Sequence, residues 1–212
     1  MRRLPPHLYF GLDLGQRRDP SALAILQRIH EPTGERDPFT MEQQWKLYFR
    51  LRHAERFHLG TPYLTIVDRV RELLRDGDGA LRAGWPFAPG QLTDPDKTLV
   101  VDASGLGAPV VELFQRAKLH SSLIALTITG SGSPHNNGAY QGSGYTVPRR
   151  DLVTNLRLFL ERGILRIPTH MHAFDDIREE LLNLQDEAGH NRDDMAIALA
   201  LAAWWASRNV QL

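Results

Sequence analysis

Three acidic features of this chain could do chemistry: Asp13, Asp102 and the adjacent pair Asp193 and Asp194. Asp13 interrupts an apolar, strand-like run, and an unpaired carboxylate buried in a core strand is costly. We therefore expect a cation or a substrate as its partner. The other positions keep structural alternatives, because Asp193 could cap a helix and Asp102 could cap the turn at Gly105.

Carboxylates gathered at one sheet edge would form an oxygen-only site, since the chain has no cysteine and little histidine nearby. Such ligands suit Mg²⁺ or Mn²⁺. Two of these ions about 4 Å apart can clamp the attacking and leaving oxygens of a phosphodiester. The candidate chemistry is thus two-metal hydrolysis of a phosphodiester bond.

The elements that would position these acids are two strands and a helix. In residues 8–15, alternate side chains make one apolar face and one face of Tyr9, Gly11, Asp13 and Gly15, where the glycines are expected to clear space around the carboxylate. Residues 98–103 predict a buried parallel strand, whose carboxyl end is the edge where ligands gather in open α/β sheets. The Asp193–Asp194 pair begins an alanine-rich helix that is apolar nearly all round and therefore buried.

The remaining segments predict an α/β fold, a mixed sheet flanked by helices within one domain over residues 1–212. Strands are expected at 21–29, as the partner strand of a hairpin, and at 45–52, 122–129 and 164–167. Helices are expected from 61 to the glycines at 77 and 79, at 108–118, at 151–162 closed by Gly163, and at 174–184 with a buried face. Between them we expect a turn at 31–40, a connection at 76–96 and a flexible loop at 130–145.

Composition limits the classes of function. Formal net charge is +0, so binding of a polyanion would need local patches of charge. Absence of cysteine excludes disulfides and fits a reducing compartment, and no leader sequence is evident. The most apolar run, residues 195–206, is shorter than the roughly 20 residues that span a bilayer. We expect a cytoplasmic protein without a membrane partner.

Four blocks of sequence resemble the nuclease domain of tailed-phage large terminases, which has a ribonuclease H-like fold. These blocks lie in the family's order at residues 11–22, 100–105, 147–152 and 190–202. The last block, a histidine and an aspartate pair before an alanine-rich helix, is the most specific. The resemblance implies a bacteriophage DNA-packaging nuclease that cleaves double-stranded DNA in the host cell cytoplasm.

The same resemblance assigns roles to individual residues. Asp13, Asp102 and Asp194 match the catalytic, metal-binding carboxylates, with Asp13 and Asp102 on the first ion and Asp194 with its neighbour Asp193 on the second. Asp19 matches an acidic residue found near the first carboxylate in some members. His190 matches a histidine that can approach the scissile phosphate, and Arg149 and Arg150 lie where related proteins place basic residues that could contact DNA. Arg17 and Arg18 lie in the turn after Asp13 and could face the same DNA backbone. For His190, Arg149 and Arg150 a solvated surface position is the alternative.

One departure is clear: large terminases carry an ATPase motor, and no G-x-x-x-x-G-K-[ST] phosphate loop occurs in this chain. Either this chain is an excised or split nuclease domain, for which the resemblance implies an ATPase domain, a small terminase and a portal as partners, or it is a stand-alone nuclease. Three alternatives stay open: a Holliday-junction resolvase of the same fold, an actin-like sugar kinase or ATPase, and a non-catalytic DNA-binding module.

Overall fold

The computed structural model describes residues 6–15, 19–75, 96–104, 108–130, 135–136, 143–186 and 192–208. These residues form a mixed sheet with the strand order β6-β7-β5-β4-β1-β2-β3-β8. The strands are β1 His7–Asp13, β2 Ala22–Arg36, β3 Gln43–Arg56, β4 Asp96–Asp102, β5 Ser122–Thr129, β6 His135–Asn136, β7 Ser143–Pro148 and β8 Leu165–Arg166. The helices are α1 Tyr63–Arg75, α2 Ala108–Arg116, α3 Arg149–Glu161, α4 Phe174–Asn183 and α5 Asp194–Arg208.

Strand β1 lies at the change of direction within the sheet. It pairs antiparallel with β2 and parallel with β4, and β4, β5 and β7 continue in parallel. The expected mixed α/β sheet flanked by helices is confirmed. Since Leu12 pairs with Val101, the two parallel strands end beside each other, with Asp13 and Asp102 as their last residues.

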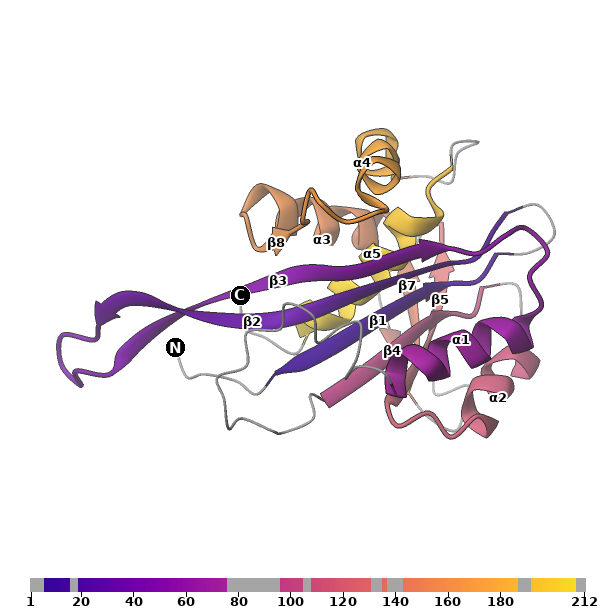
Figure 1. Cartoon of the computed structure of the whole chain (residues 1–212), viewed down its shortest axis with the longest axis horizontal. Coiled ribbons are helices and arrows are strands. Elements are labelled where there is room, and N and C mark those ends of the chain that lie inside the picture. The colour runs from indigo at the N-terminus through magenta and orange to yellow at the C-terminus, as the bar shows by residue number, and fades with distance from the viewer. Residues whose placement is uncertain are drawn as a thin grey trace.

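Helices cover both faces of the sheet (Figure 1). The apolar face of β1, which includes Phe10 and Leu12, packs with buried residues of α1 and α2. The face that carries Tyr9 packs with α3, α4 and α5, and α5 is buried along nearly its whole length. This burial is the reason for its alanines, which let a helix lie close to the strands.

Gly11 shows how close that approach is. A Cβ at this position would lie 1.9 Å from the carbonyl oxygen of Ala198 and 2.8 Å from the backbone nitrogen of Ala202. At Gly15 a Cβ would lie 2.0 Å from the carbonyl oxygen of Asp19. The expectation that these glycines clear space around Asp13 is wrong, because they make room for α5 and for the turn after β1.

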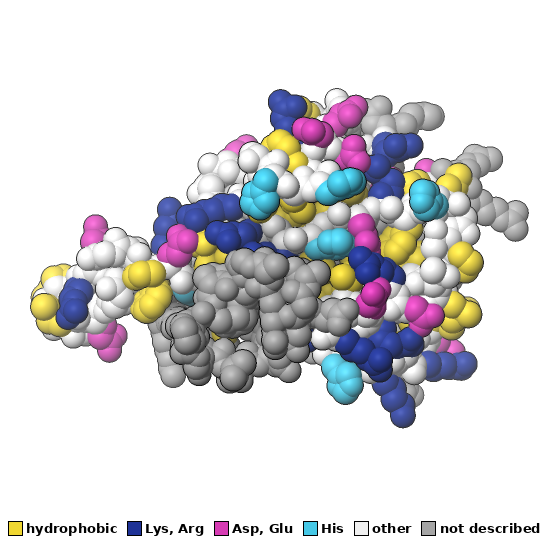
Figure 2. Space-filling view, viewed as in Figure 1, with side chains coloured by type: hydrophobic (Ala, Val, Ile, Leu, Met, Phe, Trp, Pro, Cys, Tyr) yellow, Lys and Arg dark blue, Asp and Glu magenta, His cyan; other side chains and the backbone are white. Residues whose placement is uncertain are grey.

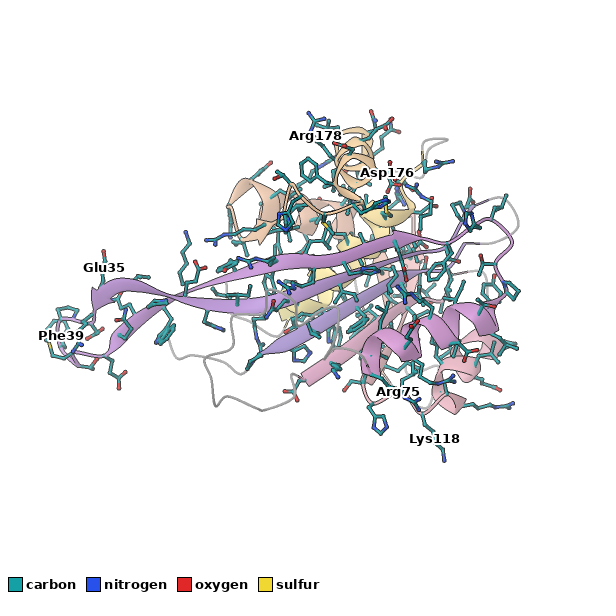
Figure 3. The ribbon with its side chains drawn as sticks, viewed as in Figure 1. Glu35, Phe39, Arg75, Lys118, Asp176 and Arg178 are labelled. Atoms are coloured by element: carbon teal, nitrogen blue, oxygen red, sulfur yellow. The ribbon has the colours of Figure 1, made fainter. Side chains whose placement is uncertain are left out.

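The hairpin of β2 and β3 extends beyond the body of the molecule as a two-stranded arm (Figure 1). Residues 31–36, expected to form a turn, continue β2, and the chain reverses only at residues 37–42. There the Asp37 carboxylate accepts the N–H groups of Phe39 and Thr40 at 3.0 and 2.9 Å. Hydrophobic side chains gather at the end of the arm (Figure 2), where Phe39 is 93% exposed and projects outward (Figure 3).

Other boundaries agree with the sequence in part. Strand β5 and helix α3 lie where they were expected, and Gly163 closes α3 with a φ of 62°. The loop expected over 130–145 is wrong in two places, because His135–Asn136 form β6 and Ser143 begins β7, which pairs with both β6 and β5. Leu182, expected on the buried face of α4, is 71% exposed. The expected glycine end of α1 and most of the connection at 76–96 lie outside the described residues. None of the described helices combines the length and the hydrophobicity needed to cross a membrane.

Candidate metal-binding and catalytic site

Asp102 ends β4 at the carboxyl edge of the parallel strands. Its Oδ1 accepts the backbone N–H of Ser104 at 2.8 Å, so the turn-capping role considered above is present. Burial is the largest influence on this carboxyl and raises its pKa, while hydrogen bonds from Ser104 and the charge of Arg149 act in the opposite direction. Asp102 is therefore oriented by its turn but is not neutralised by a direct ion pair with a described residue.

Asp13 ends the neighbouring strand, and its carboxylate makes no hydrogen bond with any described residue. Burial raises the pKa of Asp13 well above its usual value. The negative charges of Asp102, Asp194 and Asp193 raise the pKa further, and Arg149 lowers it. The ends of β1 and β4 and the start of α5 thus place four carboxylates in one electrostatic environment.

Asp193 directly precedes α5, and its carbonyl accepts the backbone N–H of Ile197 at 2.9 Å. Its carboxylate forms an ion pair with Arg149, the first residue of α3. The helix-start interpretation of Asp193 is therefore present together with a charge partner. Arg149, which was expected to contact DNA, lies among the acids in this structure.

Asp194 is held in a buried network that also contains Glu180 of α4 and Arg56 of β3. Asp194 is 7% exposed, and its Oδ2 lies 3.6 Å from Nε of Arg56 without a hydrogen-bond partner in the described part of the chain. Glu180 is 4% exposed, binds Arg56, and accepts the N–H of Ala196 at 2.9 Å. Burial, followed by the charge of Glu180, raises the pKa of Asp194 to about 6 although Arg56 opposes the shift.

Arg56 and Glu180 were not singled out by the sequence reasoning. Glu180 follows Ile177 by three residues and precedes Leu184 by four, so it falls on the apolar stripe of α4. A charged residue on a buried helix face was the signal that could have identified it. Arg56 carried no comparable signal, because Arg50 and Arg52 lie at alternate positions of the same strand.

The other expected site residues divide into two groups. Asp19 is exposed but is close enough to Asp194 to influence its charge. Arg150 is exposed and pairs with Asp151 at 3.4 Å, as a solvated residue at a helix start would. Three expected residues lie outside the described part of the chain, namely Arg17, Arg18 and His190.

The donor set fits a hard divalent cation in its chemistry. It consists of carboxylate oxygens, three of these acids have raised pKa values, and one oxygen of Asp194 has no hydrogen-bond partner among the described residues. No three acidic or histidine side chains within the described ranges are already arranged to hold one ion. Asp193 is instead paired with Arg149, and Asp194 lies against Arg56. An ion that used either acid would compete with an arginine.

Comparison with known proteins does not extend this assignment. No family model matches the chain, and no curated protein or solved structure matches it significantly.

Proposed function

We propose that this chain is a metal-dependent endonuclease of ribonuclease H-like fold, which cleaves double-stranded DNA as the nuclease part of a viral packaging terminase. The observation that carries the proposal is the shared electrostatic environment of Asp13, Asp102, Asp193 and Asp194 at one sheet edge. These acids come from three elements far apart in the sequence. The mixed sheet with helices on both faces is compatible with the proposed fold.

The acidic edge carries an excess of negative charge, which DNA binding would have to overcome. Phosphates of DNA would be repelled by four carboxylates, so DNA could approach closely only with added positive charge. Bound Mg²⁺ or Mn²⁺ would supply that charge and would act as a Lewis acid on the scissile phosphodiester. Asp13 and Asp102 would hold one ion, and Asp194 with Asp193 would hold a second.

The chain's own residues prepare this site. Ser104 orients the Asp102 carboxylate through its backbone N–H. Glu180 and Arg56 restrain the first turn of α5 and with it Asp194. If a bound cation took the place of Arg149 beside Asp193, the guanidinium would become available for a phosphate oxygen, for which its planar donor geometry is suited.

The proposal is tested by cleavage of plasmid DNA in Mn²⁺ or Mg²⁺ with wild type and Asp13→Asn. The substitution removes a charge that burial already disfavours, so the fold should be retained, and melting temperature checks this. Asp175→Asn changes an exposed acid of α4 and is the matched control. We expect metal-dependent cutting by wild type and the control, and a loss of at least about 100-fold in Asp13→Asn.

Equal cutting by Asp13→Asn and wild type, or no cutting by wild type in either metal, would overturn the proposal. A four-way DNA junction is the informative second substrate. Preference for the junction over linear duplex would favour the resolvase alternative.

A further inference from the structure

A basic pocket of about 190 Å³ lies at the amino end of β4. We define it by its nitrogen-bearing side chains, which come from the end of α1, the start of β4 and the segment after α2: Arg71, Arg75, Lys97, Lys118 and His120. Figure 2 shows Lys and Arg side chains gathered on this part of the surface with a histidine beside them, and Figure 3 shows Arg75 and Lys118 on the same side of the molecule. None of the described residues that line the pocket is acidic.

This pocket is separate from the acidic edge. Lys97 precedes Asp102 by five residues of the same strand, which corresponds to about 17 Å at the rise of a β-strand. The two sites therefore lie at opposite ends of β4. A ligand held at the basic pocket would not touch the carboxylates.

Two of the five groups already have partners. The Lys97 ammonium donates to the carbonyl of Leu74 at 2.8 Å, and Arg71 pairs with Asp68. Arg75, Lys118 and His120 form no ion pair or side-chain hydrogen bond with any described residue. A basic residue in the last turn of a helix is ordinary, because it complements the helix dipole. That explanation accounts for Arg75 on α1 and does not account for convergence of three elements on one hollow.

The described acids that are adjacent to pocket residues in the sequence have other partners, and Glu72, beside Arg71, pairs with Arg69 at 2.7 Å. Asp96, adjacent to Lys97, interacts electrostatically with His7 and Tyr9 and does not line the pocket. Leu74, 2% exposed, forms part of the lining, so an anion seated there would be partly shielded from water. Both features strengthen the electrostatic attraction of the pocket for an anion, although the formal net charge of the whole chain is +0.

We propose that the basic pocket binds a phosphate group. Donors that approach from three elements suit a tetrahedral anion with several oxygens better than a planar carboxylate with two. The phosphate belongs either to a nucleic-acid backbone or to a small phosphorylated molecule, and both present the same oxygens. This proposal does not depend on catalysis at the acidic edge.

The test uses the full chain in EDTA, with inorganic phosphate as one probe and a fluorescein-labelled 20-base-pair DNA duplex as the other. Calorimetry follows the first probe, and anisotropy at several salt concentrations follows the second. The test variant is Arg75→Glu/Lys118→Glu, whose two side chains are exposed. Arg116→Glu is the matched control, since Arg116 is exposed on the neighbouring helix, pairs with Glu112 at 3.1 Å, and does not line the pocket.

We expect wild type and the control to bind phosphate within twofold of each other and the test variant to bind it about tenfold or more weakly. If duplex affinity falls in parallel and the salt slope decreases by about 2, the phosphate is that of a nucleic acid. If only inorganic phosphate is lost, the ligand is a small phosphorylated molecule. Absence of phosphate binding by wild type, or equal binding by the test variant and the control, would overturn the proposal. Because EDTA removes divalent ions, an inactive nuclease would leave every one of these outcomes readable.

Discussion

Replacing Glu180 by alanine should lower the free energy of unfolding by about 3 kcal/mol. The change removes the partner of Arg56, whose side chain is only 18% exposed, and leaves the N–H of Ala196 without its acceptor. Loss of one member of a buried ion pair usually costs about 3 to 5 kcal/mol. We place the expected value at the lower end because Glu180 also repels Asp194, and that repulsion disappears with it.

Two further variants separate the contributions. Glu180→Gln keeps an oxygen that can accept from Ala196 but loses the charge opposite Arg56, so a smaller loss of about 1 to 2 kcal/mol is expected. Glu179→Ala alters the adjacent, exposed side chain on the same helix and should stay within about 0.5 kcal/mol of wild type. Urea unfolding followed by circular dichroism measures all four proteins, with the midpoint compared at constant slope.

The order of stability is the critical result. Glu180→Ala should be the least stable, followed by Glu180→Gln, with Glu179→Ala close to wild type. If Glu180→Ala unfolded within about 0.5 kcal/mol of Glu179→Ala, Glu180 would not hold α5 and Arg56 together, and the account of the buried network would be wrong.

Two other predictions concern the same region. Gly11→Ala should lower the free energy of unfolding by at least about 2 kcal/mol, because its Cβ would meet the backbone of α5. Gly130→Ala is the control and should be neutral, because a Cβ there meets nothing within 4 Å. Thermal melting compares the two variants, and equal melting temperatures would refute the close contact. The pKa of Asp194 is about 6 in the folded protein and 3.8 in the unfolded chain, so the folded state binds this proton more tightly. The free energy of unfolding should therefore fall by up to about 3 kcal/mol as pH rises from 4 to 6. Urea titrations of wild type and Asp194→Asn across that range test this, since the variant should lose this component and an unchanged pH slope would contradict it.

Much of the sheet was predictable because its strands carry strong local patterns. The alternation in residues 8–15 indicated the correct strand and its apolar face, and the apolar run before Asp102 indicated the correct buried strand. The arm was not predictable in the same way, because residues 31–36 carry no large hydrophobic side chain and contact no core, so their strand conformation depends on pairing with residues 43–46 across the hairpin. Strand β7 was missed for a related reason, since the glycine and serine at its start resemble a loop until β5 pairs with them.

Asp13, Asp102, Asp193 and Asp194 were predictable from the sequence, whereas Glu180 and the ion pairs that hold the last two of these acids were not. Asp13 was conspicuous because a carboxylate in an apolar strand conflicts with its surroundings, and the pair before α5 stood out against alanines. Arg56 looks like any surface arginine in the sequence, and Arg149 was expected only as a DNA contact, so their pairing with Asp194 and Asp193 emerges only from the tertiary structure. The role of Gly11 was predicted wrongly because the sequence does not show that α5 packs against this residue.

The contact between Gly11 and α5 joins main chain to main chain. Asp13 lies two residues beyond Gly11 on the strand, and Asp194 lies four residues before Ala198 on the helix, so both carboxylates are attached to the two sides of this contact. Side chains elsewhere in the core can change rotamer without altering it. The separation of the two acids therefore depends on the absence of a side chain at Gly11, and a larger residue there would displace the helix that carries Asp194 from the strand that carries Asp13.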